Sequence, residues 1–144
     1  MGNVIIYGTF DLFHIGHKNI LDRAKEIAND RKCKLIVGVT SPEYDKERGK
    51  ELSYDSLEQR IKNVVNYCNP DNIIIENYKG QKIDDIKKYD IDTIVFGSDW
   101  KGKMDYLKEY CKVLYLPRTE GVSSTLLRKK RKINDDIRES KREL

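Results

Sequence analysis

Five short runs of apolar, largely β-branched residues recur along this 144-residue chain, and they constrain its fold more than any other feature. The runs span residues 4–7, 35–39, 73–75, 93–96 and 113–116. In several of the segments between them, apolar residues recur at the three- and four-residue spacing of an amphipathic helix. Strands that are apolar on both faces and alternate with helices are typical of a parallel sheet covered on both sides. The pattern predicts a single α/β domain with a doubly wound sheet of about five parallel strands and helices on both faces.

The segments between the strands predict where helices and loops lie. We expect helices through residues 20–28, from about 56 to 69, ending near 89, around 104–108, and from 123 onward. Segment 40–53 is polar and contains Pro42 and Gly49, so it predicts a long loop. Ligands of doubly wound sheets bind beyond the carboxyl ends of the strands. Segments 8–17, 40–53, 97–100 and 117–125 should therefore line one crevice.

Composition and charge narrow the class of protein. Lys and Arg total 28 against 24 Asp and Glu, which gives a formal net charge of +4. This balance excludes a strongly basic nucleic-acid packaging protein and allows a cleft that collects anionic small molecules. No apolar run approaches the ~18 residues that a membrane span needs. We expect no secretory signal and a cytoplasmic location.

The three cysteines, Cys33, Cys68 and Cys111, lie far apart in the sequence. Their number is odd, and their spacing fits neither a disulfide framework nor a metal knuckle. We expect reduced thiols that serve as small apolar residues.

The strongest chemical signal is segment 8–17, which reads GTFDLFHIGH and follows the first strand. At the start of a helix the first N–H groups are unpaired and the helix dipole favours an anion. Gly8 and Gly16 allow the backbone to approach a phosphate closely. His14 and His17 are three residues apart, so on a helical turn they share one face and can both donate to phosphoryl oxygens. If charged, they would also offset negative charge that develops at phosphorus.

Each of these residues also has a plainer interpretation. A single histidine is more often a satisfied structural residue, but the only two histidines of the chain both fall in this turn. A zinc site is weakly supported, because there is no third histidine and no cysteine nearby in the sequence. Asp11 is explained at least as well by capping of the following turn as by a direct chemical role.

Thr9-Phe10-Asp11 followed by His14-x-Gly16-His17 resembles the HxGH signature of nucleotidylyltransferases, and of cytidylyltransferases in particular. The resemblance implies a Rossmann-like sheet. It also implies that His14 and His17 bind the triphosphate and stabilise the transition state at the α-phosphorus. Gly8, Thr9 and Phe10 would form part of the nucleotide cradle.

A second anion site is indicated by segment 117–125, which reads PRTEGVSST. Arg118 can bond a phosphate with two N–H groups, and the serines can cap the last helix, although plain capping also explains them. The run resembles the R-T-x-G-(I/V)-S-(T/S)-T signature of cytidylyltransferases, in the form found in glycerol-3-phosphate cytidylyltransferases. That resemblance implies contacts to the CTP phosphates from Arg118, Thr119, Ser123 and Ser124, with Arg118 among the catalytic residues.

The third motif is segment 96–103, FGSDWKGK, at the end of the fourth strand. A carboxylate there can bind a nucleoside group, and Trp100 can stack on a ligand, although a loop with a half-buried aromatic is an equal alternative. The run resembles the G-D-D-W-x-G-K of glycerol-3-phosphate cytidylyltransferases, with Ser98 in place of the first Asp. This implies that Asp99 contacts the nucleotide and that Trp100 lies at the acceptor end.

Weaker signals come from four further residues, for which we predict contacts to substrate. Lys46 and Lys50 lie in a loop that carries phosphate-binding basic residues in the family, and a solvated charged loop is the alternative. Arg60 matches an arginine that lies at the active site of family members. Tyr78 lies near an aromatic that borders the acceptor site in relatives.

The C-terminal segment extends past the usual end of the family. Residues 128–132, RKKRK, could bind nucleic acid or an anionic membrane, but a solvated helix face explains them better because the tail is acid-balanced. We expect neither nucleic-acid nor membrane binding. We assign residues 1–132 to a nucleotidylyltransferase domain and 133–144 to a helical tail.

Together these resemblances imply an enzyme that transfers CMP from CTP to sn-glycerol 3-phosphate, giving CDP-glycerol and pyrophosphate. The resemblance implies a role in making teichoic-acid or capsule-type polymers, and a homodimer. We expect Mg²⁺ to bridge the CTP phosphates, with no dedicated protein ligands. Two alternatives stay open. One is another substrate pair, such as a different polyol phosphate, ethanolamine phosphate, or ATP for CTP. The other is a non-catalytic nucleotide- or RNA-binding domain.

Overall fold

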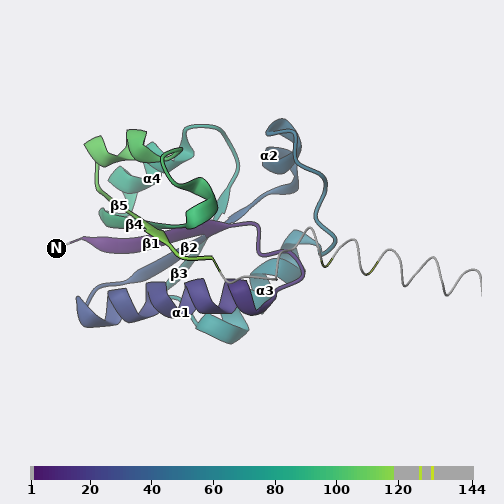
Figure 1. The fold of residues 1–144 in the computed structure, drawn as a ribbon, viewed down its shortest axis with the longest axis horizontal. Helices are drawn as coiled ribbons and strands as arrows, with labels where there is room; N and C mark the ends of the chain where they lie inside the picture. Colours follow the sequence, from purple (N-terminus) through teal and green to yellow (C-terminus); the bar gives the residue numbers. More distant parts are fainter. Residues whose placement is uncertain (1, 119–126, 128–130, 132–144) are drawn as a thin grey trace, which may run out of the picture.

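Five strands form one parallel sheet in the computed structural model, which describes residues 2–118, 127 and 131 (Figure 1). The strands are β1 (Asn3–Gly8), β2 (Leu35–Thr40), β3 (Asn72–Glu76), β4 (Ile91–Gly97) and β5 (Lys112–Leu116), in the order β3-β2-β1-β4-β5. β1 lies at the centre of the sheet and pairs with β2 on one side and with β4 on the other. The strands that follow β1 are therefore added first toward one edge (β2, β3) and then toward the other (β4, β5). The predicted doubly wound, Rossmann-like α/β fold is confirmed.

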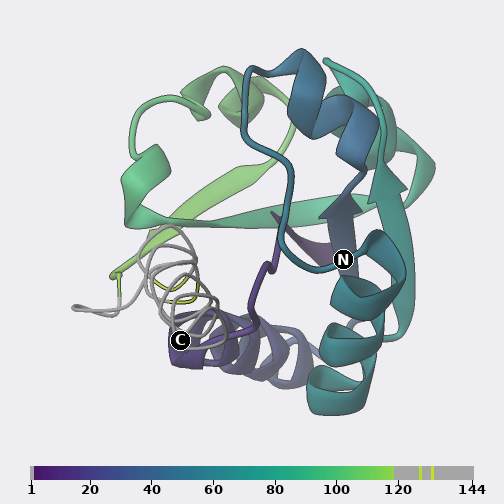
Figure 2. The same cartoon turned by 90° about the vertical axis from the view of Figure 1, so that its right-hand side faces the viewer.

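Helices cover both faces of this sheet. They are α1 (Ile15–Asp30), α2 (Pro42–Glu47), α3 (Leu57–Cys68) and α4 (Gln81–Lys88), with the 3₁₀ turns η1 (Ser98–Trp100) and η2 (Asp105–Glu109). Figure 2 shows α1 and α3 on one side of the sheet, with α4 and η2 on the other. None of the helices in the described part of the chain is both long and apolar enough to cross a membrane.

Successive strand residues alternate between two apolar cores. Ile6 packs with Leu21 of α1 and Val64 of α3 in one core. Ile5 packs with Ile86 of α4 and Leu107 of η2 in the other. Because both faces of the central strands are buried, their sequences are apolar throughout rather than alternating.

The predicted loop over residues 40–53 is wrong in part, because it contains α2. Ser41 caps this helix by accepting a hydrogen bond from the Tyr44 N–H at 3.1 Å, and Pro42 occupies its first turn. Serine followed by proline is a helix-start signal, and here it outweighed the polar, turn-like composition. The predicted helix from about residue 56 is confirmed, with Ser56 as the cap of α3.

The carboxyl ends of the strands lie at one edge of the sheet. Gly8 is opposite Val39 in the β1–β2 pair, and Gly97 is opposite Leu116 in the β4–β5 pair. The segments that follow these strands therefore start side by side, as the sequence predicts for a ligand crevice. Leu127 and Arg131 are helical, and the remainder of the predicted C-terminal helix lies outside the described residues.

Candidate active site

The two histidines form the N-terminal cap of α1. The His14 Nδ1 accepts a hydrogen bond from the Gly16 N–H at 3.0 Å, and the His17 Nδ1 accepts one from the His14 N–H at 3.1 Å. This reciprocal arrangement is a capping box built from two imidazoles. The rings stack with their centroids 3.7 Å apart and an angle of 20° between their planes.

The hydrogen bonds fix the tautomer of both rings. A neutral imidazole has one N–H and one acceptor nitrogen, and in both residues Nδ1 is the acceptor. The proton of each ring therefore lies on Nε2. Two Nε2–H donors at the positive end of the α1 dipole form an arrangement suited to a phosphate.

Electrostatics keep this pair neutral. Burial lowers the pKa of His17 to about 3, with a further contribution from His14 that outweighs the opposing effect of Asp11. Burial, and then the positive charge of Arg118, lower the pKa of His14. At pH 7 without a ligand the pair consists of neutral donors, so its contribution to binding is directed hydrogen bonding rather than fixed charge.

Aromatic rings surround His17. The Phe13 ring lies 5.9 Å from it, nearly parallel, and the Phe10 ring meets it edge-on at 5.5 Å. Phe10 is only 3% exposed, and a Cβ on Gly8 would lie 2.8 Å from its ring. The Phe10 side chain packs in the core, where the absence of a side chain on Gly8 makes room for it. The predicted contribution of Gly8 and Phe10 to the nucleotide cradle stays a prediction.

Gly16 and Thr9 lie in the same turn. The Gly16 N–H is bonded to the His14 ring, so it supports the histidine pair. The Thr9 side chain pairs with the Thr40 hydroxyl at 3.1 Å, which joins the carboxyl ends of β1 and β2.

Asp11 does not cap the turn that follows it, contrary to expectation, because His14 occupies the cap position. Asp11 is only 1% exposed. Its carboxylate accepts hydrogen bonds from the N–H groups of Tyr54 and Asp55, both at 2.9 Å. A local capping rule could not reveal this, since the partners lie more than 40 residues away.

Arg60 is fully buried, and its predicted contact to substrate stays a prediction. Its guanidinium donates to the carbonyl oxygens of Thr9 at 3.0 Å and Thr40 at 2.8 Å, and to that of Asp55 at 3.3 Å. Arg60 thus holds together the ends of two strands.

The second and third motifs meet at the same edge of the sheet. The Arg118 guanidinium lies 3.6 Å from the Asp99 carboxylate, and both side chains are at least half exposed. The charge of Arg118 also lowers the pKa of His14, which couples Arg118 to the histidine turn. Thr119, Ser123 and Ser124 lie outside the described residues.

Trp100 lies between two lysines. The ammonium groups of Lys50 and Lys103 are each 5.9 Å from the centre of its ring. Lys50 is thereby brought to the predicted crevice. Lys46 is exposed on α2, and Tyr78 is exposed after β3 with its hydroxyl donating to Asp84 at 2.7 Å.

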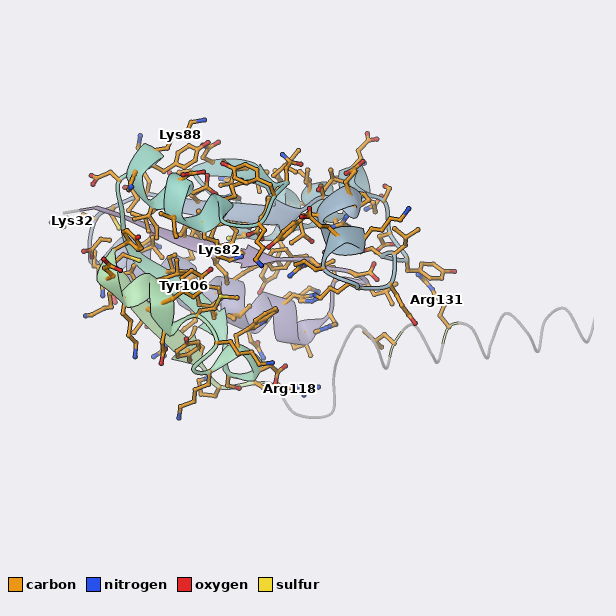
Figure 3. All side chains as sticks on the ribbon, turned by 90° about the horizontal axis from the view of Figure 1, so that it is seen from above. Lys32, Lys82, Lys88, Tyr106, Arg118 and Arg131 are labelled. Atoms are coloured by element: carbon orange, nitrogen blue, oxygen red, sulfur yellow. The ribbon has the colours of Figure 1, made fainter. Side chains whose placement is uncertain are left out.

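A cavity of about 490 Å³ lies between α2, the start of α4 and the turn before η2. Its lining comprises Tyr44, Glu47, Arg48, Lys79, Gly80, Lys82, Lys103, Met104 and Tyr106. Figure 3 labels two of these residues, Lys82 and Tyr106. Lys103 also contacts the Trp100 ring, so the cavity adjoins the predicted crevice.

The basic side chains of this cavity are held in place. Lys82 is 6% exposed, forms an ion pair with the buried Glu76, and lies 4.8 Å from the centre of the Tyr7 ring. Arg48 bonds the Asp45 carboxylate at 2.6 Å and stacks on Tyr44 at 4.6 Å. The motif search missed this lining, because it comes from three separate segments of unremarkable sequence.

Within residues 2–118, 127 and 131, no group of three or more His, Cys, Asp or Glu side chains could hold a metal ion.

Comparison with known proteins identifies the family. The family described as Cytidylyltransferase-like matches residues 5–130, which is most of the chain. This chain belongs to the cytidylyltransferase-like family. The match spans the histidine turn, the Asp99 loop and Arg118, which the fold brings to one edge of the sheet.

Three curated proteins are similar to this chain, two of them over nearly their full length. A glycerol-3-phosphate cytidylyltransferase from Bacillus spizizenii is 49% identical, covering 90% of this chain and 96% of the relative. The Staphylococcus aureus protein of the same name is 42% identical, with 89% and 93% covered. An ethanolamine-phosphate cytidylyltransferase from Arabidopsis thaliana is 30% identical over 85% of this chain but only 28% of its own length.

Solved structures share the cytidylyltransferase-like fold. A macrolide-efflux protein from Streptococcus pneumoniae superposes with a TM-score of 0.69 at 20% identity, covering 90% of this chain and 52% of that one. A lipopolysaccharide core biosynthesis protein from Thermoplasma volcanium gives 0.65 at 20% identity, covering 83% and 99%. At these identities the likeness concerns the fold alone.

Proposed function

We propose that this cytidylyltransferase transfers CMP from CTP to sn-glycerol 3-phosphate, giving CDP-glycerol and pyrophosphate. The observation that carries the proposal is the pair of stacked, neutral imidazoles at the N-terminus of α1, each with its proton on Nε2. The relatives named glycerol-3-phosphate cytidylyltransferase, which this chain matches almost end to end, supply the acceptor.

The reaction is an in-line displacement at the α-phosphorus of CTP. A phosphate oxygen of the acceptor forms the new P–O bond while the bond to the bridging oxygen of pyrophosphate breaks. Negative charge spreads over the oxygens of the five-coordinate centre, and the Nε2–H groups of His14 and His17 donate to them. Donors that are already oriented stabilise such a centre without reorganisation, so positioning and hydrogen bonding supply most of the rate.

The triphosphate would extend from this centre toward Arg118. Its guanidinium matches two phosphate oxygens, and the neighbouring residues Thr119, Ser123 and Ser124 would add donors. Asp99, paired with Arg118 at 3.6 Å, would contact the nucleoside.

For the acceptor we propose the cavity of about 490 Å³ beside Trp100. Lys79 supplies positive charge for a phosphomonoester, whereas Arg48 and Lys82 are already paired with Asp45 and Glu76 and would offer N–H donors. The hydroxyls of Tyr44 and Tyr106 can bond the glycerol hydroxyls. Lys50 lies beside Trp100 and would be positioned between the cavity and the α-phosphate. This assignment moves the acceptor from Lys46 and Tyr78 to the side chains that line the cavity.

Magnesium would arrive with the substrate, as the CTP complex. Mg²⁺ usually keeps several waters and binds through substrate phosphates. The ion would neutralise phosphate charge. The protein residues would orient the chain of phosphates around it.

We further propose a cytoplasmic homodimer. In the described part of the chain β3 is an edge strand that pairs only with β2. Val65 and Tyr67 on α3 and Ile75 on β3 are each about two-fifths exposed. Exposed apolar side chains beside a sheet edge are suited to contact with a second subunit. Sedimentation of the protein should give twice the mass of the chain. A monomeric mass would contradict this assignment.

A pyrophosphate-release assay that crosses nucleotides with acceptors tests the function. CTP with sn-glycerol 3-phosphate should give the highest kcat/KM, with ATP and ethanolamine phosphate far lower. Preference for another pair would change the substrate but keep the reaction. The protein would instead be a binding domain if no pair released pyrophosphate and if the protein bound RNA in a salt-sensitive way that was lost when residues 128–132 were deleted.

A further inference from the structure

Two loops far apart in the sequence hold each other by reciprocal hydrogen bonds. The Asp11 carboxylate accepts the N–H groups of Tyr54 and Asp55, and the Asp55 carboxylate accepts the Leu12 N–H at 3.1 Å. We call these three bonds the clasp. It joins the histidine turn to the loop that leads into α3.

The clasp closes on a strained stretch of backbone. Phe10 and Leu12 adopt left-handed conformations, with φ of 55° and 56°. Such a conformation is unfavourable for a non-glycine residue and persists only where surrounding contacts enforce it. The Asp55 carboxylate bonds directly to the N–H of Leu12, which is two residues before the capping His14.

The backbone of Asp55 is itself held by a buried side chain. The buried Arg60 guanidinium donates to the Asp55 carbonyl oxygen at 3.3 Å and also to those of Thr9 and Thr40. The backbone of Asp55 is thus fixed to the ends of β1 and β2. Its carboxylate can then transmit that position to the histidine turn.

We propose that Asp55 is a positioning residue for the transfer reaction: by holding the Leu12 N–H it keeps the strained turn in the conformation that aims both imidazoles at the α-phosphate. The proposal rests on the proposed function. Without this bond, residues 10–12 would relax toward ordinary backbone angles, and the Nε2–H donors would move. A displacement of about 1 Å in a reacting group can cost up to roughly a hundredfold in rate.

Kinetics of Asp55 variants test this role. Asp55→Ala should lower kcat about tenfold or more while changing the KM for glycerol 3-phosphate less than about twofold, because the acceptor cavity does not use the clasp. Asp55→Asn keeps an oxygen that can accept the Leu12 N–H, so it should recover most of the activity. Asp55→Leu, which removes the acceptor but keeps the volume, gives the same comparison if the alanine variant does not fold.

The matched control is Asp71→Ala. The Asp71 carboxylate also accepts a backbone N–H, that of Leu35 at 2.8 Å, but it does so at the opposite end of the sheet from the site. This variant should lose stability and keep kcat. Wild-type turnover in Asp55→Ala, an equal loss in Asp55→Asn, or an equal loss of kcat in Asp71→Ala would overturn the proposal.

A second readout does not require activity. The chain has only two histidines, so ¹⁵N NMR of the imidazoles reports on the site without overlap. Wild type and Asp71→Ala should show both rings as the Nε2–H tautomer, whereas Asp55→Ala should show mixed tautomers and a His17 that titrates closer to its ordinary pKa. Unchanged ring signals in Asp55→Ala would overturn the positioning role. If the wild type makes no CDP-glycerol, the proposed function fails, and the NMR comparison still decides the role of Asp55.

Discussion

The proposed reaction depends on the His17 side chain more than on any other single group. Its ring stacks between His14 and Phe13 and bonds the backbone through Nδ1, so its only proton is on Nε2. His17→Ala should lower kcat by roughly a hundredfold or more, the usual loss for one oriented donor at a developing negative charge. Steady-state pyrophosphate release measures this, with circular dichroism to check folding. Near wild-type turnover in a folded variant would refute the role.

The pKa of His17 also predicts how stability depends on pH. The folded-state pKa of about 3 lies below the ordinary value of 6.5, so the unfolded chain binds a proton that the folded chain does not. The free energy of unfolding should therefore be highest above pH 6.5 and fall as the pH is lowered, by roughly 3 kcal/mol between pH 7 and 4 from this residue. Denaturant titrations of wild type and His17→Gln measure it. The variant should show a flatter profile, and parallel profiles would contradict the depressed pKa.

Among the elements, α2 is the one that depends most on its cap. It has only six residues, and it carries Tyr44 to the cavity and ends next to Arg48. Ser41→Ala removes the acceptor for the Tyr44 N–H and should lower the free energy of unfolding by about 1 kcal/mol. Equilibrium denaturation gives the value. An unchanged free energy of unfolding would mean that packing, and not the cap, stabilises α2.

Strands and longer helices of this protein could be predicted from the sequence, because burial on both faces leaves unbroken apolar runs and burial on one face leaves a 3.6-residue period. α3 and its Ser56 cap follow from such local signals. α2 was missed because it is short and polar on its surface, although Ser41 and Pro42 marked its start.

Considering the whole molecule, the acceptor cavity is assembled from three segments that only the fold brings together. Lys79 is exposed at its rim and forms no ion pair with another described residue, so it can be changed without loss of a core contact. Lys79→Gln should raise the KM for glycerol 3-phosphate about tenfold, as expected for a lost charge-assisted hydrogen bond, and leave that for CTP unchanged. Lys87→Gln, which lies against Tyr110, is the control. Equal effects of the two substitutions on the KM for glycerol 3-phosphate, or an effect on the KM for CTP alone, would show that the acceptor binds elsewhere.

The three motifs could be placed together in advance, because parallel strands bring their carboxyl ends to one edge of the sheet. The individual roles of Asp11, Phe10 and Arg60 could not. Asp11 and Arg60 have hydrogen-bond partners more than 40 residues away in the sequence, and the burial of Phe10 depends on how the turn packs in the core. The cavity lining was likewise beyond prediction, since no local pattern marks Lys79, Lys82 and Tyr106 as neighbours.

The most direct test is a crystal structure of the protein with CTP. The account predicts that the Nε2 atoms of both His14 and His17 lie about 3 Å from oxygens of the α-phosphate or its neighbours. It also predicts the triphosphate next to Arg118 and an unobstructed path to the cavity lined by Lys79 and Tyr106. A nucleotide bound away from the start of α1, or imidazoles whose Nε2 atoms face the protein interior, would contradict it.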